Sequence, residues 1–119
     1  TQCPEACPTA LREIAGAKAL LGMEGARLRG IFVTVDPERD TAEVLTAYMG
    51  SFDPAFIALR PTSEQLNRVA AEFNIQVRQR PGGSSSPYTI NHTAASFVYD
   101  PQGRPRLYAR SQPGAAALA

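Results

Sequence analysis

Residues 30–35 read Gly30-Ile31-Phe32-Val33-Thr34-Val35, a nearly continuous apolar run rich in β-branched side chains. A short run of this kind is typical of a strand that is buried on both faces of a sheet. Asp36-Pro37 ends the run, and Asp40 followed by Glu43 has the pattern of a helix cap. A buried strand that leads directly into a helix predicts a layered α/β fold.

The rest of the chain continues this alternation of helices and strands. Apolar residues at three- and four-residue steps predict a helix that starts at Pro8 and ends near Gly22. A short strand at 56–59 and a helix capped by Thr62 and Gln65 follow. The last part predicts a hairpin between 94–99 and 104–110. Five phenylalanines are expected in the core: Phe32, Phe52, Phe56, Phe73 and Phe97.

The size and composition of the chain limit its class. At 119 residues it has the length of one domain, and we expect residues 1–119 to form a single one. Its 44% apolar and 19% charged residues are typical of a globular protein. The formal net charge of +1 provides no general attraction to nucleic acid or anionic lipid. No run of ~18 apolar residues is present, so no membrane span is predicted within these residues.

The residues with the most distinctive chemistry begin the chain: Thr1-Gln2-Cys3-Pro4-Glu5-Ala6-Cys7-Pro8. Cys3 and Cys7 are the only cysteines, and His92 is the only histidine. Cys7 falls at the start of the predicted first helix, where unpaired N–H groups and the helix dipole favour a thiolate. Two thiolates and one imidazole indicate either a soft-metal site or a redox pair with a nearby base.

Several interpretations of these three residues stay open on chemistry alone. Thiolate and imidazole ligands suit Cu(I), which accepts low coordination numbers. Structural zinc requires four ligands where three are available, although a catalytic zinc with an open position also fits. In a third interpretation the cysteines form a structural disulfide in a binding module or redox sensor.

The loop-like segment 78–87, the residue Asp36 and the two arginines of that segment each have two interpretations. Residues 78–87 are a loop by composition, and their glycines and serines either let His92 move toward the cysteines or form an ordinary surface loop. Asp36 either faces the metal region or caps a turn through its side chain. Arg78 and Arg80 either attract an acidic partner or are simply solvated.

Three stretches together resemble the SCO/SenC family of thioredoxin-like copper proteins, which are needed for cytochrome c oxidase assembly. They are Cys3-Pro4-Glu5-Ala6-Cys7-Pro8-Thr9, Val35-Asp36-Pro37-Glu38-Arg39-Asp40-Thr41, and Asn91-His92-Thr93 ahead of Asp100-Pro101-Gln102-Gly103. The resemblance implies an α/β, thioredoxin-like fold with a central mixed sheet flanked by helices. It also implies a chain that is truncated before the cysteine motif and at its C-terminus.

The resemblance further implies a copper chaperone with Cys3, Cys7 and His92 as ligands of Cu(I), with Cu(II) as an alternative. Its partner would be cytochrome c oxidase subunit II, which receives copper at its binuclear site, with other periplasmic copper chaperones or thioredoxin-like reductases as further partners. The alternative function is a thiol–disulfide oxidoreductase in which Cys3 and Cys7 keep the oxidase cysteines reduced, so whether the protein is also an enzyme stays open. The implied location is the periplasmic face of the bacterial inner membrane, or the mitochondrial intermembrane space, with membrane attachment only through a segment outside this chain.

Overall fold

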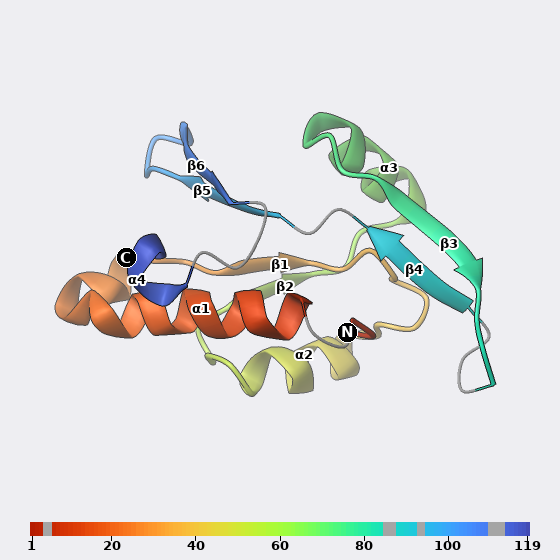
Figure 1. Cartoon of the computed structure of the whole chain (residues 1–119), viewed down its shortest axis with the longest axis horizontal. Helices are drawn as coiled ribbons and strands as arrows, with labels where there is room; N and C mark the ends of the chain where they lie inside the picture. Colours follow the sequence, from red (N-terminus) through yellow and green to blue (C-terminus); the bar gives the residue numbers. More distant parts are fainter. Residues whose placement is uncertain (4–5, 85–87, 93–94, 110–113) are drawn as a thin grey trace.

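The computed structural model describes residues 1–3, 6–84, 88–92, 95–109 and 114–119, and its elements alternate as predicted (Figure 1). The helices are α1 (Ala6–Leu20), the 3-10 helix η1 (Gly22–Arg27), α2 (Ala42–Gly50), α3 (Ser63–Glu72) and α4 (Ala115–Leu118). The strands are β1 (Ile31–Val33), β2 (Ile57–Leu59), β3 (Val77–Pro81), β4 (Tyr88–His92), β5 (Ser96–Tyr99) and β6 (Pro105–Ala109). None of the helices in these residues is long and apolar enough to cross a bilayer.

Within the described residues the strands lie in three two-stranded sheets instead of one continuous sheet. β1 and β2 run parallel, and α2 belongs to the crossover between them, as a parallel pair requires. β3 pairs antiparallel with β4, and β5 pairs antiparallel with β6 in the predicted hairpin. The arrangement places α1 and α2 beside the parallel pair, while β3 and β4 extend from one end of it (Figure 1).

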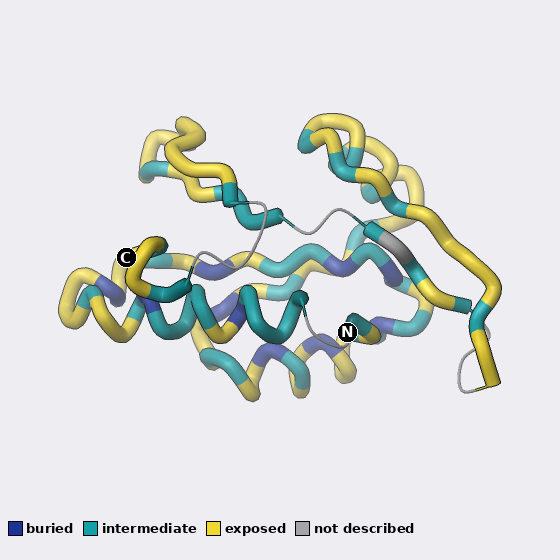
Figure 2. The backbone as a smooth tube through the Cα atoms, viewed as in Figure 1, coloured by how far each residue is buried: buried dark blue, intermediate teal, exposed yellow. Residues whose placement is uncertain are grey.

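The core lies between α1, α2 and one face of the β1–β2 pair, where most of the buried backbone in Figure 2 is found. It is centred on three buried residues, Leu11, Met49 and Phe56. Phe32 and Ala58, which are register partners, pack against this cluster. The side chain of Ile31 points the other way and is 60% exposed. The prediction of a strand covered on both faces is therefore wrong for the described part of the chain, which covers only one of them.

Two of the five phenylalanines predicted in the core lie elsewhere. Phe73 and Phe97 stack edge-to-face with ring centroids 5.1 Å apart, and Phe97 also contacts Tyr108. Both are partly exposed and contact the β5–β6 hairpin instead of the central cluster. Aromatic residues bury much of their surface against one another in such satellite clusters, so apolar character alone does not assign them to the main core.

Local sequence signals predicted one helix cap correctly and one wrongly. Thr62 and Gln65 form the expected reciprocal capping box at the start of α3. The cap of α2, however, is Thr41, whose hydroxyl accepts a hydrogen bond from the N–H of Val44. Asp40, the predicted cap, is fully buried and its carboxylate is occupied by tertiary contacts. A buried carboxylate takes the strongest donors available to it, and here these come from other segments.

The stretch 78–87 was predicted to be a loop, and its first part is instead strand β3. Arg78 lies opposite Asn91 and Arg80 opposite Thr89, so the backbone of this polar segment is satisfied by pairing with β4. Both arginines are exposed. Ser85, Ser86 and Pro87 lie outside the described residues. An exposed two-stranded pair needs no apolar alternation, which is why composition favoured a loop.

Candidate metal centre

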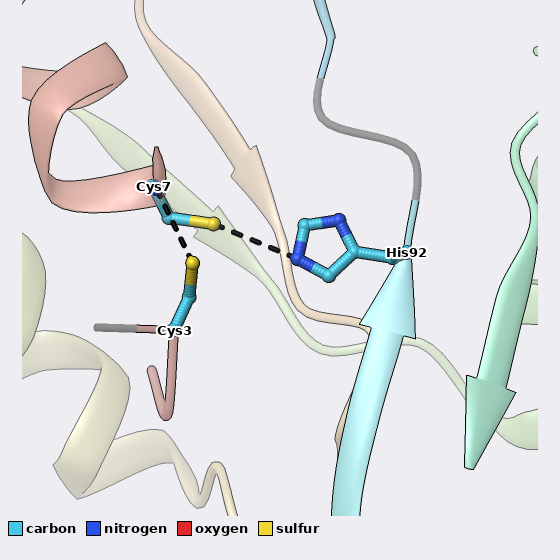
Figure 3. Close-up of side chains that lie close together, drawn as sticks. All are labelled: Cys3, Cys7 and His92. Carbon is cyan, nitrogen blue, oxygen red and sulfur yellow. Dashed lines mark hydrogen bonds between the residues drawn. The ribbon is translucent and has the colours of Figure 1, made fainter. Parts of the chain in front are cut away.

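The structure brings the three predicted residues together. The ligand atoms of Cys3, Cys7 and His92 all lie within 4.8 Å of one another, and each residue is partly buried. Figure 3 shows the two sulfurs and the imidazole pointing toward a shared point from separate elements. The three residues are thus neither fully buried nor fully exposed.

The helix N-terminus positions the two sulfurs. α1 begins at Ala6, two residues before the predicted start, so Cys7 lies in its first turn. The N–H groups of a first turn have no acceptor within the helix. The N–H of Cys7 donates to the sulfur of Cys3 at 3.4 Å, so the backbone holds Cys3 Sγ against the helix start. Both cysteines are free thiols in this arrangement.

The end of β4 positions the imidazole. His92 is the last residue of that strand, opposite Val77 of β3. Its Nε2 lies 3.7 Å from the sulfur of Cys7, drawn as a dashed line in Figure 3. Cys7 therefore contacts both of the other members of the group. His92 thus belongs to a strand in this arrangement, and whether the 78–87 segment lets it move toward the cysteines stays a prediction.

The turn formed by residues 34–40, between β1 and α2, lies beside both segments. Thr34 Oγ1 accepts a hydrogen bond from the N–H of Asp36 at 3.0 Å and donates one to Asp40 at 2.5 Å. Asp40 also accepts a 2.5 Å hydrogen bond from the hydroxyl of Thr1, two residues before Cys3. This turn is thus connected to the segment that carries the sulfurs.

The same turn is connected to the segment that carries the imidazole. Asp36 accepts hydrogen bonds from Arg39 Nε and, at 2.8 Å, from the hydroxyl of Tyr88, which begins β4. Arg39 also donates to the carbonyl of Tyr88 at 2.9 Å and lies 4.0 Å from the centre of its ring. The hydrogen bond with Asp36 raises the pKa of the Tyr88 phenol. Asp36 was predicted either to face the metal region or to cap a turn; its carboxylate instead binds the side chains of Arg39 and Tyr88, a structural role of a different kind.

Sequence reasoning missed Tyr48, which it assigned only to the apolar side of α2. Its hydroxyl is buried and has no hydrogen-bond partner among the described residues. Burial raises the pKa of Tyr48 to about 12, and the nearby sulfurs of Cys7 and Cys3 add to the increase. Its hydroxyl, within an otherwise apolar stripe of α2, is the signal in the sequence that marks this position.

A Tyr48→Phe variant should therefore keep or gain stability. The substitution removes a hydroxyl that is buried without a partner, and burial of such a group costs about 1–3 kcal/mol. We expect urea unfolding to give a free energy equal to or above that of the original chain, and absorbance titration to lose the step at about 12. Tyr99→Phe, at an exposed tyrosine, is the control for ring chemistry. A loss of more than about 1 kcal/mol in Tyr48→Phe would contradict this account.

The donor set determines which metals fit the three residues. Thiolate sulfurs favour soft ions, and imidazole suits copper and zinc. Two sulfurs and one nitrogen give the low coordination number that Cu(I) tolerates, whereas structural zinc sites are four-coordinate. The three residues therefore fit Cu(I), and their role as ligands stays a prediction.

Comparison with known proteins identifies a family and relatives that match most of the chain. A family model described as SCO1/SenC matches residues 1–119. An SCO2-like protein of Rickettsia prowazekii is 34% identical over 105 residues, which are 87% of this chain and 51% of that protein. A mitochondrial SCO1 homologue of Mus musculus is 29% identical over 105 residues, covering 87% and 37%. The chain spans about half the length of the bacterial relatives it matches.

Solved structures resemble the chain over nearly all of its length. ScoI of Bradyrhizobium japonicum with copper bound has a TM-score of 0.81 and 32% identity, covering 98% of this chain and 76% of that one. ScoI of Arabidopsis thaliana with copper bound has a TM-score of 0.86 and 25% identity, covering 98% and 73%. These likenesses confirm the predicted α/β, thioredoxin-like fold.

Proposed function

Because the chain belongs to the SCO1/SenC family, we propose that it is a copper carrier that binds one Cu(I) ion through Cys3, Cys7 and His92. The observation that carries the proposal is the convergence of the three ligand atoms within 4.8 Å. Their chemistry matches a soft, low-coordinate ion. Copper-bound relatives of the same fold support the choice of metal.

The order of ligand exchange during delivery follows from the difference between the neutral imidazole and the two thiolates. A thiolate of an acceptor protein displaces the neutral imidazole first, so that one Cu–N bond breaks as one Cu–S bond forms. The two sulfurs of the carrier are then exchanged in turn, and copper stays Cu(I) throughout. We propose cytochrome c oxidase subunit II as the acceptor and the periplasmic face of a bacterial inner membrane as the place of transfer, on the basis of family membership.

Titration of the reduced chain with Cu(I) under anaerobic conditions tests the proposal. We expect one tightly bound ion per chain in competition with a chromogenic Cu(I) chelator, and X-ray absorption should detect two sulfur neighbours and one nitrogen. His92→Ala should weaken binding at least tenfold, since even groups outside the ligand shell contribute about 10–100-fold. Absence of a one-to-one complex, or equal affinity of His92→Ala, would rule the carrier function out.

A second candidate function is thiol–disulfide exchange, favoured by the proximity of the two free sulfurs. Attack by one thiolate on a disulfide of the acceptor gives a mixed disulfide, and the second cysteine resolves it. Two electrons pass to the acceptor, which becomes a dithiol, while Cys3 and Cys7 become a disulfide. Single-cysteine variants should trap the mixed disulfide with oxidase subunit II, and failure of both variants to do so excludes this activity.

A further inference from the structure

The 34–40 turn lies between the two segments that bring the proposed ligands together. Four hydrogen bonds form a continuous path from Tyr88 through Asp36, Thr34 and Asp40 to Thr1. One end of the path is four residues before His92, and the other end is two residues before Cys3. The interior of this path is buried, since Thr34, Asp36 and Asp40 are all buried residues.

We propose that Arg39 is a positioning residue, which sets the separation between His92 and the cysteine sulfurs by fixing the start of β4. The expected effect on copper affinity rests on the proposed copper-binding function. The positioning of His92 itself is a property of the metal-free chain and can be measured without copper. The contacts of Arg39 that support this role are those with Tyr88 and Asp36. Arg39 acts through Tyr88, and Asp36 holds both of them.

Arg39 is suited to this role because it contacts β4 in more than one way. Its guanidinium donates to the Tyr88 carbonyl and covers the Tyr88 ring, while Nε binds the Asp36 carboxylate that also accepts the Tyr88 hydroxyl. The planar guanidinium makes directed contacts of this kind that an ammonium group does not reproduce. Its side chain is 20% exposed and that of Asp36 is 8% exposed, so solvent screens the pair only in part.

The arrangement of β4 makes the position of His92 sensitive to this anchor. In the described residues the β3–β4 pair joins no other strand, and Figure 1 shows it extending from one end of the molecule. Tyr88 and His92 are four strand residues apart, which is about 13 Å. A rotation of about 10° at Tyr88 therefore displaces His92 by about 2 Å. Metal–ligand bonds tolerate only about 0.2 Å, so this displacement matters for binding.

The first measurement uses the reduced, metal-free chain. We expect a nuclear Overhauser contact between the His92 imidazole and the Cys7 β-protons in the original chain, since Nε2 and Sγ are 3.7 Å apart. In Arg39→Gln this contact should be lost and the imidazole resonances should shift. Tyr88→Phe, which keeps the ring and removes only the hydroxyl, should weaken the contact in the same direction. Arg104→Gln, which breaks a more exposed arginine–aspartate pair with Asp100 in the β5–β6 hairpin, is the control and should leave the contact unchanged.

The second measurement is Cu(I) affinity in a double-mutant cycle with His92→Ala. Arg39→Gln should weaken binding by roughly tenfold, within the range of groups that orient ligands. In the His92→Ala background the same substitution should change affinity by less than about twofold, since there is then no imidazole to position. An equal loss in both backgrounds, or an unchanged contact between His92 and Cys7 in Arg39→Gln and Tyr88→Phe, would overturn the inference. If the original chain fails to bind Cu(I), the proposed function fails, and the metal-free measurement still decides the role of Arg39.

Discussion

In a Cys7→Ser variant, Cu(I) affinity should fall by at least about 100-fold. Loss of a group that only orients a ligand already costs about 10–100-fold, and this variant removes a residue that we propose as a direct ligand. A serine hydroxyl is neutral and hard, and it is a poor ligand for a soft ion. Cys7 also contacts both other members of the site, through its N–H to Cys3 and its sulfur to His92. Competition titration of the reduced protein under anaerobic conditions measures the effect.

Cys3→Ser is the comparison variant for Cys7→Ser, and thermal unfolding tests whether either substitution affects stability. Cys3→Ser leaves the contact between Cys7 and His92 in place, so we expect a loss that is large but no greater than that of Cys7→Ser. Both variants should unfold at about the temperature of the original chain when metal is absent, because both cysteines are only partly buried. An affinity within tenfold of the original for either single variant would show that its sulfur is not a ligand.

Phe56→Ala should produce the largest loss of stability, about 3–5 kcal/mol in the free energy of unfolding. Phe56 is 7% exposed and belongs to the central cluster with Leu11 and Met49. Leu11 is on α1, one turn after Cys7, so the cluster also supports the helix that holds the sulfurs. A loss of this size is a large part of the 5–15 kcal/mol that stabilises typical domains. Urea unfolding followed by circular dichroism measures it.

The neighbouring residue Ile57 is the matched control. It is 46% exposed on the same chain segment, so Ile57→Ala removes a comparable apolar side chain from a half-solvated position. We expect a loss of less than about 1 kcal/mol, because little apolar surface returns to water and no cavity forms. Equal losses for Phe56→Ala and Ile57→Ala would mean that the described cluster does not determine stability.

The sequence predicted most elements of the fold because their signals are local. The stripe that includes Leu11 predicted α1, and Thr62 with Gln65 predicted the start of α3. Strand β3 was missed because Arg78 and Arg80 are exposed and pair only through the backbone, which leaves no apolar pattern. The N-cap of α2 was assigned to Asp40 instead of Thr41. A local rule cannot recognise that the Asp40 carboxylate already accepts a hydrogen bond from the Thr34 hydroxyl.

The proposed ligands were named from the sequence, but their supports were not. Two cysteines four positions apart and one histidine are distinctive residue types, and the family resemblance connects them. Arg39 and Tyr88 are common residue types, and they lie 49 positions apart in the sequence. Their contact exists only in the folded chain, and no spacing rule relates an arginine in a turn to the first residue of a distant strand. Their importance emerges from geometry alone.

The contact between Cys7 and His92 joins residues 85 positions apart. An ion held there ties the chain into a large ring, much as a disulfide of that span would. For a covalent link of this length, the reduced freedom of the unfolded chain is worth roughly 4–5 kcal/mol. A copper ion bound as proposed would thus act as a reversible cross-link, and its release would remove that constraint from the chain. On the proposed function, the copper-loaded form is therefore expected to unfold less readily than the metal-free form, and to be the slower of the two to be cleaved by a protease that attacks unfolded chains.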